Sequence, residues 1–144
     1  MIWFGGKLPS FERIEQACTA AMHGHLGLEF AGLGDDWLAI RMPVDQRTHQ
    51  PAGRLHGGAS VVLAETVASI AANYCVDGGS EIVVGMEINA NHVRPARQGW
   101  VTGTARPEMI GRTSQVWSIR IEDEQGRLVC IARFTGAVIP AARS

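Results

Sequence analysis

The sequence lacks long apolar runs, an excess of charge and an export signal. No run of about 18 uninterrupted apolar residues is present, which argues against a membrane-spanning helix. The 144 residues carry 13 basic and 14 acidic side chains, a formal net charge of -1. With no basic block interleaved with aromatics, a nucleic-acid-binding protein is not expected. Since no basic segment leads into an apolar stretch at the N-terminus, no secretory signal is expected either.

Cysteine pairs are also missing. Cys18, Cys75 and Cys130 are far apart, odd in number and form no Cys-x-x-Cys motif. We therefore expect a reduced, cytoplasmic setting in which the cysteines act as small apolar side chains. His23 and His25 have no third ligand nearby, so they are interpreted as a helix-end turn, and no metal is expected.

Several catalytic signatures are absent as well. There is no Gly-x-Ser-x-Gly motif, so a serine-hydrolase elbow is not supported. There is no Gly-x-Gly-x-x-Gly motif or P-loop, which argues against the usual dinucleotide and nucleotide sites. With no linker or internal repeat, the chain is predicted to be one domain over residues 1–144, with residues 1–25 as a helical cover.

The stretch Gln50–Ser69 organises the rest of the chain. Its proline and glycine predict a loop, which leads through His56 into Gly57 and Gly58. An alanine-rich apolar run continues to Cys75 and predicts a helix of about five turns. Because apolar residues occupy nearly every face, the protein is expected to surround this helix.

Glu65 is the carboxylate inside that run. Glu65, Ser69 and Asn73 follow one another at four-residue spacing and predict a narrow polar stripe. One interpretation places the stripe on a solvent-exposed edge. The other places it in a cleft, where Glu65 could act as a general base or a nucleophile and Ser69 could hold a water or bond its own helix.

Gly57 and Gly58 offer the second chemical feature. Consecutive glycines at a helix start leave N–H groups approachable at the positive end of the helix dipole. Such groups stabilise an oxygen that gains negative charge. The alternative is structural: the glycines allow a tight turn, and His56 only caps the helix.

The remaining elements predict an antiparallel α+β fold. A short amphipathic helix is expected over Phe11–Met22, capped by Ser10 and stopped by Gly24. Hairpin-length connections favour antiparallel pairing, so the sheet curls around the helix and leaves one side for another copy of the chain. The predicted strands are Leu28–Leu33, Trp37–Pro43, Ile82–Val93, Trp100–Arg106, Ser114–Asp123 and Leu128–Ile139.

Basic residues cluster near two strand ends. In the strand Ile82–Val93, alternation places His92 with Met86 and Ile88, where it is either a core or interface histidine or a ligand group. Arg94 and Arg112 could grip phosphates or could be isolated surface arginines. Arg112 lies in the Met109–Ser114 segment, which is expected to be a hairpin turn.

Two motifs contain most of the candidate groups: Leu55-His56-Gly57-Gly58-Ala59-Ser60-Val61-Val62-Leu63-Ala64-Glu65 and Val84-Gly85-Met86-Glu87-Ile88-Asn89-Ala90-Asn91-His92-Val93-Arg94. They resemble the hotdog-fold acyl-CoA thioesterases of the phenylacetate-type superfamily. The similar group includes the 1,4-dihydroxy-2-naphthoyl-CoA thioesterases and the proofreading thioesterases of enterobactin synthesis. The resemblance implies a hotdog fold, in which an antiparallel sheet wraps a central helix, and a homodimer that assembles to a homotetramer.

The resemblance also implies roles for residues. Glu65 is the expected catalytic carboxylate, facing Gly57 of the neighbouring subunit, whose amide polarises the thioester carbonyl. Gln50 and His56 are expected to orient and polarise, and Thr66 and Ser69 to lie in the cleft. The expected coenzyme A region comprises Gly85, His92, Val93, Arg94, Pro95, Met109, Ile110, Gly111, Arg112, Thr113 and Ser114.

The expected activity is metal-free and cofactor-free hydrolysis of an aromatic or medium-chain acyl-CoA, with an acyl carrier protein as a possible partner. Two alternatives stay open: a hotdog hydratase or dehydratase, and a non-catalytic acyl-CoA-binding module. The first would need a histidine paired with another acid–base group, and His56 has no evident partner in the helix. The second would tolerate the loss of Glu65.

Overall fold

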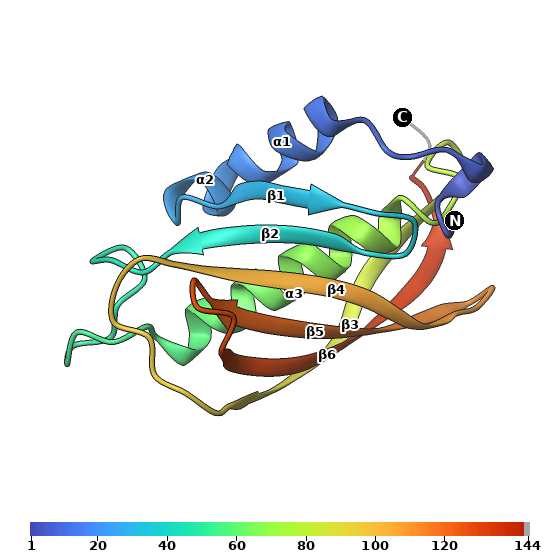
Figure 1. The fold of residues 1–144 in the computed structure, drawn as a ribbon. Helices are drawn as coiled ribbons and strands as arrows, with labels where there is room; N and C mark the ends of the chain where they lie inside the picture. The colour runs from blue at the N-terminus through green and yellow to red at the C-terminus, as the bar shows by residue number, and fades with distance from the viewer. Residues whose placement is uncertain (143–144) are drawn as a thin grey trace.

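One antiparallel sheet curls around a central helix, α3, which spans Gly57–Asn73 (Figure 1). The computed structural model describes residues 1–142. The strands lie in the order β1-β2-β4-β5-β6-β3. This confirms the α+β architecture, although β4 continues past its predicted end at Arg106. The strands are β1 Glu29–Leu33, β2 Leu38–Pro43, β3 Glu81–His92, β4 Trp100–Ile110, β5 Ser114–Asp123 and β6 Leu128–Pro140.

Helix α3 is buried on the side that meets the sheet. Leu63, Ala64 and Val67 are fully buried there, and the many alanines let the strands approach closely. On β4, a Cβ added at Gly103 would lie 3.1 Å from Cγ of Leu63, so that glycine makes room for the helix. The helix ends at Asn73, slightly before the predicted end at Cys75.

The other side of α3 is only partly covered. Val61, Glu65 and Ser69 are half-buried there, whereas the alanines on the adjoining face of the helix are fully buried. The structure therefore agrees with the expectation that the sheet wraps only part of this apolar helix. Glu65 lies on the partly covered side.

Strand β3 forms an edge of the sheet and contains a bulge. Within residues 1–142 it pairs with β6 alone, and the register shifts between Gly85 and Glu87. Met86 is 66% exposed, whereas Ile88 packs against the core. The prediction that Met86 shares a side with Ile88 and His92 is therefore wrong, because the bulge interrupts the alternation.

Asn73 joins the end of α3 to β3. Its side-chain amide donates to the carbonyl of Val83 and accepts from the N–H of Val83, both at 2.9 Å. The amide also donates to the carbonyl of Ser69 at 2.9 Å. Asn73 thus satisfies backbone groups on the free edge of β3 and is a structural residue, contrary to its predicted place in a cleft stripe.

We expect Asn73→Ala to lower the free energy of unfolding by about 1–3 kcal/mol, because it leaves backbone groups of the buried Val83 unpaired. Denaturant titration measures this change. Asn91→Ala on the exposed outer face of β3 is the matched control and should change stability little. Equal stability of the two variants would contradict the assignment.

The N-terminal segment packs on β1 as two helices, α1 Phe11–Thr19 and α2 Ala21–His25, after a 3-10 turn η1 Phe4–Gly6. The N–H of Arg13 donates to the Ser10 side chain at 3.4 Å, which confirms the predicted cap. The continuous helix predicted over Phe11–Met22 is wrong, because Ala21 has a φ of 50° and breaks it.

The predicted stop at Gly24 is also wrong. A Cβ on Gly24 would lie 2.3 Å from the carbonyl oxygen of Thr19, so this glycine permits α2 to fold tightly onto the end of α1. Helix α2 instead ends at His25, and Gly27, which has a φ of 72°, turns the chain toward β1. The buried side chains of Ile14 and Cys18 pack α1 against the hydrophobic core.

The three cysteines are unpaired. Cys18 and Cys130 are buried, as predicted for small apolar side chains. Burial, with a smaller effect of the Glu15 charge, raises the pKa of Cys18 to about 11. Burial raises the pKa of Cys75 to about 12, so neither thiol is a nucleophile near neutral pH. A cytoplasmic location stays a prediction.

No helix in the described part of the chain has the length and apolar character needed to cross a membrane.

Candidate active site

Hydrogen bonds fix the loop between β2 and α3 to the segments on both sides of it. The Thr48 hydroxyl donates to the carbonyl of Pro43 at 2.7 Å, and the N–H of His56 donates to the carbonyl of Thr48 at 2.8 Å. The N–H of Leu55 donates to the carbonyl of Ala96, also at 2.8 Å. These bonds fix the loop against the segment that follows β3, and they hold the approach to the start of α3.

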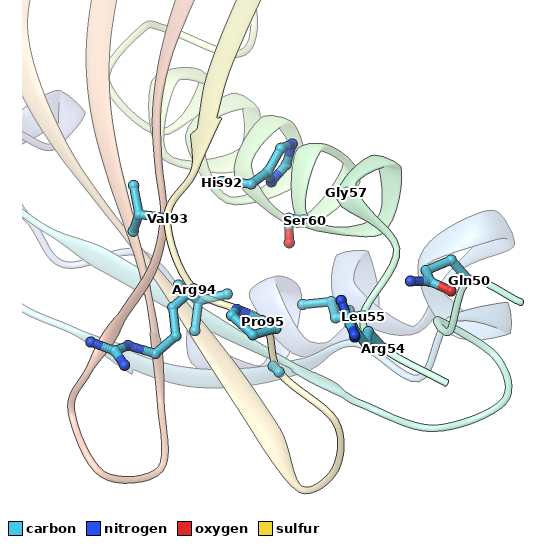
Figure 2. A pocket seen from close by; sticks show the side chains of 11 residues that line it. Gln50, Arg54, Leu55, Gly57, Ser60, His92, Val93, Arg94 and Pro95 are labelled. Atoms are coloured by element: carbon cyan, nitrogen blue, oxygen red, sulfur yellow. The ribbon is translucent and has the colours of Figure 1, made fainter. Parts of the chain in front are cut away.

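A cavity of about 400 Å³ opens between this loop, the first turn of α3 and the end of β3 (Figure 2). Most of its walls are apolar, and Gln50, Gly57, Ser60 and His92 contribute polar groups. Such a pocket suits an apolar group that carries a few polar atoms. Its lining consists of Gln50, Arg54, Leu55, Gly57, Ser60, His92, Val93, Arg94, Pro95, Ala96 and Val129.

Gly57 presents the free donor at the start of α3. The N–H of Gly58 donates to Nδ1 of His56 at 2.7 Å, and the N–H groups of Ala59 and Ser60 both donate to the carbonyl of His56. Within residues 1–142, the N–H of Gly57 has no acceptor. It therefore lies at the positive end of a 17-residue helix and is available to a ligand oxygen.

His56 caps the helix and does not line the cavity. Since its Nδ1 accepts a hydrogen bond, the proton of a neutral ring lies on Nε2. The capping alternative for His56 is thus what the structure supports. His92, by contrast, extends from β3 toward the first turn of α3 (Figure 2). A Cβ added at Gly57 would lie 3.0 Å from Nε2 of His92.

Glu65 lies apart from this cavity in the same chain. Gly57 and Glu65 are eight residues apart in α3, which is about 12 Å along the helix axis. The Glu65 side chain is half-buried and approaches β3, where a Cβ on Gly85 would lie 2.6 Å from its Oε1. Within the described residues its carboxylate makes no hydrogen bond or ion pair. Glu65 is therefore half-buried and belongs to no structural pair within the described residues.

Six of the predicted site residues meet in the cavity. They are Gln50, Gly57, His92, Val93, Arg94 and Pro95. Among the other predicted residues, Ser69 is half-buried on the partly covered side of α3, and Thr66 is buried.

The Met109–Ser114 segment lies far from His92 within one chain. Gly85 pairs with Gly136 of β6, which pairs with Gln115 of β5. His92 pairs with Cys130 of β6, which pairs with Ile121 of β5. Six residues of β5 separate these levels, which is about 20 Å. Met109 and Ile110 also end β4 and are not in the turn. The single chain does not bring the two parts of the expected coenzyme A region together.

The sequence-based interpretation missed five lining residues: Arg54, Leu55, Ser60, Ala96 and Val129. Ser60 could have been found, because it lies three residues after Gly57 and so on the same helix face. Its hydroxyl points into the cavity (Figure 2). Ala96 and Val129 reach the site through contacts between distant segments, for which the sequence carries no local signal.

Within residues 1–142, no group of three or more histidine, cysteine, aspartate or glutamate side chains is placed to hold a metal ion. The polar groups of the cavity are one amide side chain, one hydroxyl, an imidazole, two guanidinium groups and a free backbone N–H. Such a set can bind an oxygen through hydrogen bonds and balance anionic charge.

A sheet wrapped around one long helix is the architecture of the hotdog fold, and three relatives place the chain among the hotdog-fold hydrolases. The crystal structure of a thioesterase from Haemophilus influenzae superposes with a TM-score of 0.92 at 46% identity, covering 99% of this chain and 98% of that one. The 1,4-dihydroxy-2-naphthoyl-CoA hydrolase of Escherichia coli is 49% identical over 96% of this chain and 100% of that protein. The proofreading thioesterase EntH of Cronobacter turicensis is 47% identical over 96% of this chain and 99% of that protein.

The model of the thioesterase superfamily matches residues 52–130. The chain belongs to the thioesterase superfamily and is a thioester hydrolase with a hotdog fold.

Proposed function

We propose that this chain hydrolyses acyl-CoA thioesters with an aromatic or medium-chain acyl group. The observation that carries the proposal is Gly57 at the positive end of α3: its N–H has no acceptor within the described residues, and the residue lines a largely apolar cavity. A thioester carbonyl oxygen gains negative charge when it is attacked, and an N–H held at this position stabilises that charge. The relatives named for acyl-CoA and proofreading thioesterase activity support the same chemistry.

Glu65 supplies the second part of the reaction. As a general base it takes a proton from water, whose oxygen attacks the carbonyl carbon; the C–S bond then breaks, and coenzyme A leaves as a thiolate that is protonated. As a nucleophile it attacks the carbonyl carbon itself; the C–S bond breaks, coenzyme A leaves as a thiolate that is protonated, and water then cleaves the resulting anhydride to the free acid and Glu65. Single turnover in ¹⁸O-water distinguishes the routes, because attack on the Glu65 side of an anhydride leaves the label in the enzyme.

One chain cannot complete this site, since Glu65 and Gly57 are about 12 Å apart along α3. Glu65 lies level with Gly85 on β3, and Gly57 lies level with His92. If the free β3 edges of two copies pair antiparallel about a twofold axis, the Gly85 end of one strand lies beside the His92 end of the other. Glu65 of one copy then faces Gly57 of its partner. The unpaired edge of β3 and its exposed Met86 and Val93 support this dimer.

A complementation experiment tests the shared site. Glu65→Gln and Gly57→Pro are each expected to be nearly inactive, yet a mixed dimer holds one site with both native residues. Co-expressed in equal amounts, the two variants form mixed dimers for half of the population. The mixture should recover about a quarter of the wild-type activity, because each mixed dimer has one working site of two. No recovery in purified mixed dimers would contradict the shared site.

The phosphates of coenzyme A need cationic partners. Arg54 and Arg94 line the cavity, and within the described residues neither forms an ion pair. The Arg94 side chain extends away from α3 toward the outside (Figure 2), where a pyrophosphate could reach it. Arg112 and its turn could join them only from another copy of the chain, which would fit assembly beyond a dimer.

Thiol release from a panel of acyl-CoAs tests the proposed substrate class. We expect aromatic and medium-chain acyl-CoAs to give the highest kcat/KM, and acetyl-CoA to be a poor substrate because it leaves the apolar walls unfilled. The same acyl groups on a carrier protein show whether that carrier is preferred. Equal rates for all chain lengths would contradict an acyl group bound in the cavity.

A further inference from the structure

Gly85 has no space for a side chain because Glu65 occupies that space. A Cβ built on Gly85 would lie 2.6 Å from Oε1 and 3.7 Å from Cδ of Glu65. These distances are at or below van der Waals contact, so even a methyl group at position 85 would displace the carboxylate from where it now lies.

The backbone does not require glycine at this position. The glycines with a φ in the left-handed region are Gly5, Gly6, Gly27, Gly53, Gly99 and Gly126, and Gly85 is not one of them. Any L-residue could adopt its conformation. The missing side chain therefore contributes space and not conformational freedom.

The surface beneath the carboxylate is closely packed. Gly85 pairs with Gly136 of β6, and the ring of Phe134 is close to both: Cε2 would be 3.2 Å from a Cβ on Gly85, and Cε1 2.9 Å from a Cβ on Gly136. Phe134 is fully buried. A carboxylate pushed off this surface can move only outward, toward the partly covered side of α3.

We propose that Gly85 is a positioning residue for Glu65: its missing side chain forms the recess that sets where the catalytic carboxylate lies. The inference rests on the proposed function and deepens it, since it adds a residue that acts through Glu65. The bulge directly follows Gly85, and the next side chain, Met86, is 66% exposed.

Gly85→Ala tests this role. We expect kcat to fall about 10- to 100-fold with KM changed less than about threefold, because misplacing a catalytic group by about 1 Å costs up to about 10²-fold. The melting temperature should fall little, since the closest clash is with the free end of a long side chain. The matched control is Gly136→Ala, whose Cβ would meet Val83 Cγ1 at 2.5 Å but not Glu65. That control should melt earlier and keep its kcat per folded enzyme.

A double-mutant cycle separates positioning from damage to the fold. In the Glu65→Gln background, Gly85→Ala should lower kcat no further, because the group that it misplaces is already lost. An additive loss would overturn the inference. If Gly85→Ala folds poorly, the comparison is made in a Phe134→Leu background, which removes the ring contact. The kcat of the Phe134→Leu/Gly85→Ala variant is then compared with that of Phe134→Leu alone.

The outcomes distinguish the two proposals. A Gly85→Ala enzyme with wild-type kcat, alongside an inactive Glu65→Gln, would overturn the positioning role alone. A Glu65→Gln enzyme that keeps full activity would overturn the proposed function and the positioning role together.

Discussion

Glu65→Gln is expected to lower the kcat of thioester hydrolysis by about 10²- to 10⁴-fold. The amide keeps the shape of the side chain but can neither take a proton from water nor attack the carbonyl. Because the Glu65 carboxylate makes no hydrogen bond or ion pair within residues 1–142, the substitution breaks no structural contact. We therefore expect KM and the melting temperature to change little.

Thiol release measured over a range of acyl-CoA concentrations gives both constants, and binding of a non-hydrolysable acyl-CoA analogue confirms that the variant still recognises its ligand. Glu12→Gln is the matched control, since it removes an exposed carboxylate on α1 and should leave kcat unchanged. Undiminished thiol release by Glu65→Gln would remove the residue from the mechanism. Retained binding with lost hydrolysis would also separate the enzyme from a non-catalytic binding module.

Gly57→Pro is expected to lower kcat by about 10²- to 10³-fold, the cost of losing one donor to a developing oxyanion. Proline at the first position of a helix removes an N–H that has no helical acceptor, and its fixed φ suits that position. The preceding His56 is extended, with φ -67° and ψ 131°, as a residue before proline requires. The substitution should thus delete the N–H and keep the helix.

Gly57→Ala provides the comparison, because alanine adds a similar Cβ beside His92 and keeps the N–H. Its kcat should fall less than about tenfold, and the difference between the two variants then measures the donor itself. Circular dichroism checks that α3 is intact in both. Equal losses in the alanine and proline variants would assign the effect to crowding and contradict the role of the N–H.

The structure also bears on the hydratase alternative. That chemistry needs a histidine that reaches the acyl chain, but His56 caps α3 through Nδ1 and does not line the cavity. His92 reaches the first turn of α3, and the described chain gives it no carboxylate partner. The hydrolase assignment, supported by the family and its relatives, agrees with this arrangement.

Local patterns were enough to locate the main elements and the main chemical groups. Glu65 in an alanine-rich helix, Gly57 at its start and the period-two alternation of β5 each depend on interactions within a few residues, which the sequence records directly. The motif around these residues also led to the correct family. Ser114–Asp123 was predicted with the bounds that β5 has in the structure.

The arrangement of distant segments was decided only by the tertiary structure. From the sequence alone, Asn73 is one more polar position four residues after Ser69, yet its side chain forms hydrogen bonds with the backbone of Val83 on β3. Similarly, only the register of β3 on β6 places Gly85 beneath Glu65 and separates the Met109–Ser114 segment from His92. Helix spacing and strand alternation are short-range properties of the chain, whereas register, bulges and recesses arise from packing among strands far apart in sequence.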